Sequence, residues 1–243
     1  MKRFALLSFL LSITYGLCGC GSPENNSVPQ VNNDMSLDQA TLQKERPRHG
    51  DHKHAFQDPA ECAKKWNASD RDEWQHPEAI IAALELKPGA MVAEIGAGTG
   101  YMVSHLSKSV GESGTVIAID ASSAMIAFLE KHSAEMPPAK VVARKVPRGD
   151  PELAGACLDG VLMLDTWHHV EDRESYAEKV YEGLKPGGRF VVVDFEVDAA
   201  AGPPKSMRLT PEQVGSQLKA AGFRTEILPN SMPRHYLVVG HRD

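Results

Sequence analysis

From residue 77 onward, short runs of consecutive apolar residues alternate with longer segments that have helical periodicity. Strands that are apolar throughout are typical of a parallel sheet whose two faces are covered by helices. The pattern therefore predicts a single doubly wound α/β domain over residues 77–243. The expected strands are 91–95, 115–119, 140–146, 160–164, 189–194, 225–228 and 235–239, and the expected helices are 77–86, 101–110, 122–132, 173–184 and 211–221.

The first of these strands runs directly into a loop with glycine at every second position, Gly96, Gly98 and Gly100, and a helix follows. Glycine lets a ligand approach the backbone, and the start of a helix presents free N–H groups. Asp120 ends the second strand, where such an acid hydrogen-bonds ribose hydroxyls in doubly wound sheets. The combination predicts a nucleoside site. A dinucleotide site is disfavoured, because it requires the spacing Gly-x-Gly-x-x-Gly.

The segment Glu94–Gly100 resembles the first motif of the class I S-adenosylmethionine (SAM) methyltransferases, an acid followed by Gly-x-Gly-x-Gly. Val116–Asp120 resembles the second motif, Asp159–Asp165 the fourth-strand region, and Leu184–Gly188 the turn before the fifth strand. The likeness extends over about residues 77–239 and is strongest to the small-molecule branch related to quinone-biosynthesis methylases. It implies a seven-stranded, mostly parallel, Rossmann-like sheet, SAM as cofactor and a small-molecule acceptor.

The same resemblance assigns roles to individual residues. The cofactor-binding set that it implies is Glu94, Gly96, Ala97, Gly98, Thr99, Gly100, Asp120, Met125 and Asp165. In that set the glycine loop passes under the amino-acid end of SAM and Asp120 holds the ribose. Met125 either packs on the adenine or belongs to the helix core. The chain departs from the family after the third strand, where an acid usually contacts the adenine amine and only Asp150, several residues later, is available.

Methyl transfer requires a positioned nucleophile and sometimes a general base. His168 and His169 follow the fourth strand, at the ligand-binding edge of such sheets, and we expect them to be the catalytic residues. They could equally cap a helix or line the pocket. Asp194, at the end of the fifth strand, is a weaker candidate. Residues 55–76 are expected to form a lid, from which Arg71, Trp74 and His76 face the substrate or pack against the sheet edge.

The N-terminus has the features of an export signal. Lys2 and Arg3 precede an apolar stretch that is too short to span a bilayer as a helix. The stretch ends in Leu17-Cys18-Gly19-Cys20, which resembles a bacterial lipobox. Residues 1–19 are therefore expected to be a lipoprotein signal peptide and Cys20 the lipidated residue, with a buried N-terminal helix as the alternative. This signal sequence predicts a membrane anchor on the periplasmic side, in the outer rather than the inner membrane.

Residues 20–54 contain few apolar side chains and are expected to be a polar tether. His49, His52 and His54 lie at its end and could collect a metal ion, although a soluble linker is the simpler interpretation. We therefore predict no metal site. Cys62 and Cys157 remain after processing, and the sequence leaves open whether they form a disulfide.

Composition excludes several classes of protein. Apolar residues make up 42 % of the chain, which excludes a disordered chain, and a net charge of -6 argues against nucleic-acid binding. Two hypotheses remain. One is a membrane-tethered SAM-dependent methyltransferase of a small molecule, and the other is a catalytically silent lipoprotein of the same fold that binds a metabolite or a metal. The export signal conflicts with the cytoplasmic origin of SAM.

Overall fold

The computed structural model describes residues 58–153 and 155–243. The predicted signal peptide, Cys20, the tether and the three histidines at its end lie outside these residues. Within the described residues, no helix has both the length and the apolarity needed to cross a membrane.

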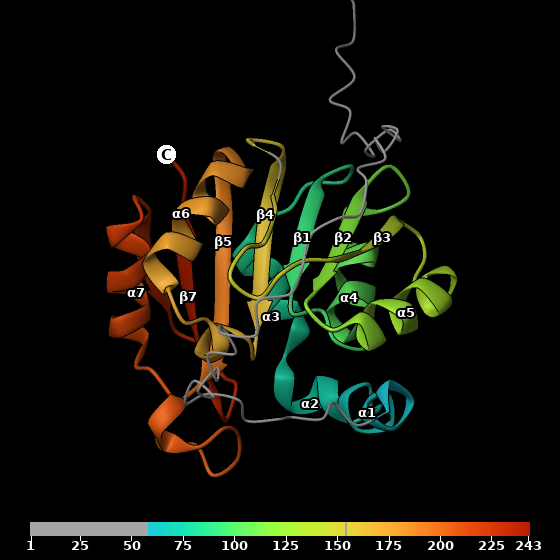
Figure 1. Cartoon of the computed structure of the whole chain (residues 1–243), viewed down its shortest axis with the longest axis horizontal. Coiled ribbons are helices and arrows are strands. Elements are labelled where there is room, and N and C mark those ends of the chain that lie inside the picture. The colour runs from blue at the N-terminus through green and yellow to red at the C-terminus, as the bar shows by residue number, and fades with distance from the viewer. Residues whose placement is uncertain (1–57, 154) are drawn as a thin grey trace, which may run out of the picture. The chain divides into compact units, whose positions relative to one another are not determined.

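The described residues form one seven-stranded sheet in the order β3-β2-β1-β4-β5-β7-β6 (Figure 1). All neighbouring pairs are parallel except those made by β7, which runs antiparallel to both β5 and β6. The predicted doubly wound, mostly parallel sheet is therefore confirmed. The strands are β1 (Met91–Ile95), β2 (Thr115–Asp120), β3 (Lys140–Lys145), β4 (Leu158–Leu164), β5 (Leu184–Phe195), β6 (Arg224–Leu228) and β7 (His235–His241).

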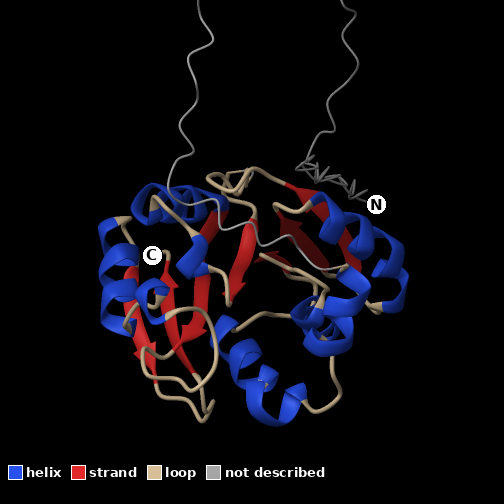
Figure 2. Ribbon diagram, turned by 60° about the horizontal axis from the view of Figure 1, so that its bottom comes forward, coloured by secondary structure: helices blue, strands red, loops and turns tan. Residues whose placement is uncertain are grey.

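Helices cover both faces of the sheet (Figure 2). One apolar cluster joins the sheet to α3, α4 and α5, and a second cluster joins the opposite face to α6 and α7. Because both faces are buried, the central strands are mostly apolar, as the sequence indicated. The helices are α1 (Pro59–Trp66), α2 (Arg71–Gln75), α3 (Pro77–Leu84), α4 (Tyr101–Val110), α5 (Ser123–His132), α6 (Arg173–Gly183) and α7 (Pro211–Ala220).

Two features differ from the expected elements. The segment 55–76, expected as a lid without assigned helices, contains α1 and α2. Asp58 caps α1 by accepting a hydrogen bond from the Ala60 N–H at 3.0 Å, and Pro59 occupies the first turn, which are standard start signals. β5 begins at Leu184 rather than at residue 189, because Leu184 pairs with Leu158 before the register shifts.

The parallel strands β1 to β5 end at one edge of the sheet, here called the carboxyl edge. Helices α1 and α2 lie along this edge in Figure 1, together with the segment that follows β5. In open α/β sheets the ligand site lies at this edge. The fold therefore places the glycine loop, Asp120 and the residues after β4 around a common region.

A buried serine tests the packing on the α4 face. Ser107 is fully buried, and its Oγ donates to the Met136 carbonyl at 2.6 Å and accepts from the Ala139 N–H at 2.9 Å. Ser107→Ala leaves both backbone groups unpaired, so we expect the free energy of unfolding to fall by about 1–3 kcal/mol. Urea denaturation measures the change. Ser109→Ala on the same helix is the control, and equal stability of the two variants would contradict the prediction.

Candidate ligand site at the carboxyl edge

The loop between β1 and α4 is a sequence of left-handed turns. The backbone φ angles of Gly96, Gly98 and Gly100 are 79°, 53° and 85°, values that residues with a Cβ rarely adopt. A Cβ on Gly96 would lie 2.2 Å from Thr166 Oγ1, in the segment after β4. The alternating glycines are thus required both by the path of the loop and by the close approach of a neighbouring segment.

Asp120 is tied to this loop. One of its carboxylate oxygens accepts the Gly98 N–H at 2.9 Å, and the other accepts the Ser122 N–H at 2.8 Å. The side chain is only partly buried, and an ionised carboxylate has further lone pairs available. Asp120 can therefore accept hydrogen bonds from a ligand while it holds the loop. The structure brings together the two features that the sequence singled out as a nucleoside site.

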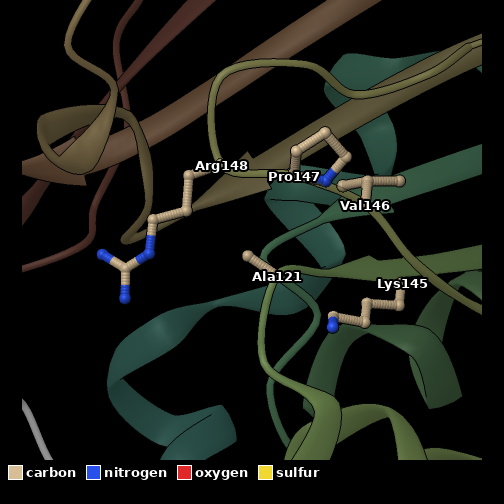
Figure 3. Close-up of a pocket in the computed structure, with 5 residues that line it drawn as sticks. All are labelled: Ala121, Lys145, Val146, Pro147 and Arg148. Carbon is tan, nitrogen blue, oxygen red and sulfur yellow. The ribbon is translucent and has the colours of Figure 1, made fainter. Parts of the chain in front are cut away.

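A hollow of about 320 Å³ lies beside Asp120, between the ends of β2 and β3. It is lined by Ala121 and by the segment Lys145–Arg148 (Figure 3). Lys145 pairs with Asp120 in the β2–β3 register, which fixes the hollow next to the carboxylate. This hollow could not be identified from the sequence, because its lining residues come from the segment after β2 and from the end of β3 with the loop that follows it, and they share no motif.

Glu94 is buried beneath the loop. Only 3 % of the residue is exposed, and its Oε2 has no hydrogen-bond partner within the described residues. Burial raises the pKa of Glu94 to about 8, against the opposing effect of the Arg71 guanidinium and with a further increase from Asp120. A buried carboxyl oxygen without a partner is unfavourable, so this atom is suited to a hydrogen-bond donor from a ligand.

Helices α1 and α2 close over the loop from the N-terminal side. The Asn67 amide donates to the Thr99 carbonyl at 3.1 Å, and the Thr99 hydroxyl donates to Asn67 Oδ1 at 2.7 Å. The Trp66 ring lies 3.4 Å from the position that a Cβ of Gly98 would occupy. These contacts place the predicted lid segment against the glycine loop. Ala97 and Thr99 of the loop are both buried.

Arg71 lies at the centre of the lid contacts. It is 9 % exposed, donates to the Trp66 carbonyl at 2.7 Å, and lies over the Tyr101 ring with its guanidinium carbon 4.0 Å from the ring centre. Its Nη2 is 3.7 Å from Asp165 Oδ2. Arg71 Nε is buried and has no partner among the described residues. The guanidinium therefore keeps a donor available beside Glu94.

Asp165 joins the lid to β7. Its backbone φ is 53°, and its Oδ1 lies 2.8 Å from His235 Nε2. The His235 side chain is fully buried, and its ring stacks with Trp74 of α2 at 6.2 Å between ring centres. His235 was missed by the sequence analysis. It starts a strand, and only the antiparallel pairing of β7 with β5 brings it to the carboxyl edge, opposite Phe195.

The two expected catalytic histidines differ in environment. His168 is buried, and its Nδ1 lies 2.8 Å and 3.0 Å from the two carboxylate oxygens of Asp194. Asp194 also accepts the backbone N–H of His168 at 3.0 Å. His169 is exposed, with its ring centre 4.2 Å from that of His168. The structure thus gives a fixed orientation to His168 and brings Asp194 to it.

The remaining predicted residues are placed as follows. Met125 is fully buried in α5. The His76 ring lies 3.2 Å from Glu78. Cys62 lies in α1 at the carboxyl edge and Cys157 at the opposite edge, before β4, and no disulfide joins the two. Within the described residues, no group of three or more histidine, cysteine or carboxylate side chains is arranged to hold a metal ion.

Comparison with known proteins identifies this arrangement. Residues 92–188 match a family model described as a methyltransferase domain. A SAM-dependent methyltransferase of known structure from Aquifex aeolicus is 26 % identical, with a TM-score of 0.69, and the match covers 77 % of this chain and 100 % of that one. Residues 92–188 therefore form a methyltransferase domain, in a chain whose fold is similar to that of a SAM-dependent methyltransferase.

Curated relatives of the methyltransferase domain match over a shorter length. A demethylmenaquinone methyltransferase from Symbiobacterium thermophilum is 26 % identical over 129 residues, which is 53 % of this chain and 51 % of the relative. Phosphoethanolamine N-methyltransferase 3 from Arabidopsis thaliana is 29 % identical over 126 residues, 48 % of this chain and 23 % of the relative. The chain therefore spans about a quarter to a half of these relatives, and the matching region is the methyltransferase domain.

SAM is the cofactor of this domain, and the residues present fit it. Its amino-acid end carries an ammonium and a carboxylate, whereas its sugar carries two hydroxyls. Glu94 Oε2 and Arg71 Nε are buried without a partner among the described residues, and they suit the ammonium and the carboxylate respectively. The Asp120 carboxylate lies beside the loop and can accept hydrogen bonds from the sugar hydroxyls. Each type of ligand group thus has a complementary protein atom at the carboxyl edge.

The raised pKa of Glu94 predicts a pH dependence of stability. Between about pH 4.5 and pH 8 the unfolded chain releases the Glu94 proton while the folded chain retains it, so the free energy of unfolding falls as pH rises. Glu94→Gln cannot ionise, and we expect its loss over this range to be smaller by an amount on the order of a few kcal/mol. Urea denaturation at pH 5 and pH 8 measures it. Glu178→Gln, on an exposed site of α6, is the control, and parallel curves for Glu94→Gln and the unmodified chain would refute the prediction.

Proposed function

We propose that this protein transfers a methyl group from SAM to a small-molecule acceptor. The observation that carries the proposal is the hydrogen bond between the Asp120 carboxylate and the glycine loop, at 2.9 Å from Gly98 N. It holds in one place the two elements that a nucleoside ligand of this fold requires. In this proposal the cofactor-binding residues are Glu94, Gly96, Ala97, Gly98, Thr99, Gly100, Asp120, Met125 and Asp165, together with Arg71, which we include because its buried Nε has no partner among the described residues.

Glu94 and Arg71 are proposed to bind the two charges of the amino-acid end. The ammonium is placed at Glu94 Oε2 and the carboxylate at the Arg71 guanidinium, because each of these residues has a buried polar atom without a partner. An ammonium beside Glu94 favours the ionised carboxylate. Arg71 belongs to α2, so the same contact holds the lid closed. Asp165 then acts on the cofactor side by holding Arg71 Nη2, 3.7 Å away.

His168 is proposed as the proton acceptor on the acceptor side. SAM supplies an electrophilic methyl group on a sulfonium, and the acceptor must be positioned and, where it carries a proton, deprotonated. Asp194 is buried and accepts from His168 Nδ1, which leaves the lone pair of the neutral ring on Nε2. His169 is exposed, and in this proposal it lies at the entrance of the acceptor site. This orientation favours His168 over His169 as the general base.

Asp120→Ala tests the proposed cofactor site. We expect the affinity of the full chain for S-adenosylhomocysteine to fall by roughly 1–3 kcal/mol, about ten- to a hundredfold, because charge-assisted hydrogen bonds to the ribose are lost. Isothermal titration calorimetry measures the change. Asp159→Ala is the matched control, since Asp159 also holds a backbone N–H, that of Met91 at 2.8 Å, but at the opposite edge of the sheet. Unchanged affinity in a folded Asp120→Ala protein, or equal losses in both variants, would refute the assignment.

The N-terminal sequence supports a second part of the proposal, that the protein is a lipoprotein anchored through Cys20 on the periplasmic side of a bacterial membrane, the outer membrane in preference to the inner. Two or three acyl chains suffice for stable anchoring. The soluble domain then follows a polar tether over residues 20–54. This arrangement requires that SAM reaches the domain outside the cytoplasm.

Cys20→Ser tests the anchor. We expect the full chain to move from the membrane fraction to the soluble fraction, because the acylated sulfur is lost. Immunoblotting of fractionated cells measures the distribution. Cys18→Ser is the matched control and should remain in the membrane fraction, since Cys18 lies in the part removed with the signal. Retention of the Cys20→Ser protein on membranes would contradict lipidation at this residue.

A further inference from the structure

The hollow beside Asp120 is lined by both apolar and positively charged side chains. Ala121, Val146 and Pro147 provide apolar walls, and Lys145 and Arg148 provide two positive charges (Figure 3). Lysine and arginine side chains carry hydrogen-bond donors and no acceptors. Within the part of the chain that the structure describes, neither cation is paired with a carboxylate. The side chains that line this hollow therefore offer donors alone.

Asp150, the acid that follows the lining segment Lys145–Arg148, is directed elsewhere. Asp150 Oδ2 forms an ion pair with Lys179 of α6 at 2.8 Å, and Asp150 Oδ1 accepts the Glu152 N–H at 2.8 Å. Lys179 also donates to the Gly149 carbonyl at 3.3 Å. These contacts fasten the segment after Arg148 to α6, so Asp150 is held away from the lining of the hollow. Asp150, the acid that the sequence offered for the adenine amine, is thus paired with Lys179 and with the Glu152 N–H.

The two common purine types present different groups at this position. Adenine has an amino group, which donates, whereas a 6-oxopurine such as hypoxanthine has a carbonyl oxygen, which accepts. Arginine and lysine pair with the O6 and N7 atoms of a 6-oxopurine, whereas asparagine and glutamine pair with the N6 and N7 atoms of adenine. The donor-only lining matches the 6-oxopurine edge.

We propose that this base pocket binds a nucleoside thioether carrying a 6-oxopurine at least as tightly as the adenine form, with Lys145 and Arg148 as the specificity-determining residues. The proposal rests on the proposed function, because it takes the ribose to be held by Asp120. Lys145 lies opposite Asp120 in the β2–β3 register, so a base attached to a ribose at Asp120 would lie between Ala121 and Pro147. The two cations are exposed, and therefore each hydrogen bond to the base competes with water.

Calorimetric titration of the full chain with S-adenosylhomocysteine and with S-inosylhomocysteine tests this preference. The expected result is a dissociation constant for the inosyl compound equal to or below that of the adenosyl compound. Arg148→Gln replaces a side chain that pairs with O6 by one that pairs with N6. We therefore expect the affinity for the adenosyl compound, relative to that for the inosyl compound, to rise by about three- to tenfold. Lys145→Ala should shift the ratio of the two constants in the same direction.

Asp150→Asn is the matched control and should leave the ratio unchanged, because Asp150 contacts Lys179 and not the hollow. A lower dissociation constant for the adenosyl compound than for the inosyl compound in the unmodified chain would overturn the inference while the proposed function stands. An unchanged ratio in both Arg148→Gln and Lys145→Ala, or a shift in Asp150→Asn, would also overturn it. Failure of both compounds to bind would overturn the proposed function as well. Circular dichroism of each variant establishes that it is folded.

Discussion

The hydrogen bond from the Gly98 N–H to Asp120 connects the end of β1 to the end of β2, and the geometry of the site depends on it. The three glycines of the loop have no side chains to hold its left-handed path, and Thr99 is held from outside by Asn67. Asp120 supplies a fixed acceptor to the loop and a second one to Ser122 N–H at the start of α5. The same carboxylate borders the hollow at Ala121. Loop, acid and hollow therefore keep one relative arrangement.

The carboxyl edge retains polar atoms that a folded core normally avoids. Glu94 Oε2, Arg71 Nε and His235 Nδ1 are all buried without a hydrogen-bond partner within the described residues. Such groups each cost free energy, and the two apolar clusters on either face of the sheet offset this cost. These three atoms lie beneath or beside α2, whereas the other buried unpartnered side-chain atoms of the described residues belong to Arg144, Tyr236 and His241. Unpartnered buried groups of this kind are often found at functional sites.

Two histidine–carboxylate pairs lie at the ends of β4 and β5. His168 pairs with Asp194, and His235 pairs with Asp165. The rings of both histidines lie near Phe195, at 6.4 Å and 4.4 Å between ring centres. Asp194 fixes the ring of His168, whereas Asp165 links His235 to the lid through Arg71. The methyltransferase domain therefore has one histidine that is oriented by Asp194 and one that is connected to α2 through Asp165 and Trp74.

Local sequence determined the elements and the path of the glycine loop. Apolar runs, helix periodicity and alternating glycines depend on neighbouring residues, so the strands from Met91 to Asp194, the helices between them and the pairing of Gly96–Gly100 with Asp120 could be predicted. The starts of α1 and β5 were missed, although Asp58 and Pro59 carried the signal for α1.

Tertiary structure alone decided which distant side chains meet. The antiparallel insertion of β7 between β5 and β6 brings His235 to Asp165, and the folding of α2 over the loop places Arg71 near Glu94. The ion pair of Asp150 with Lys179 joins the loop after β3 to α6, and Asp150 is not among the residues that line the hollow beside Asp120. No local pattern encodes these contacts, because each depends on the order of strands and the packing of separate elements, and the energy that selects them comes from burial of the whole domain.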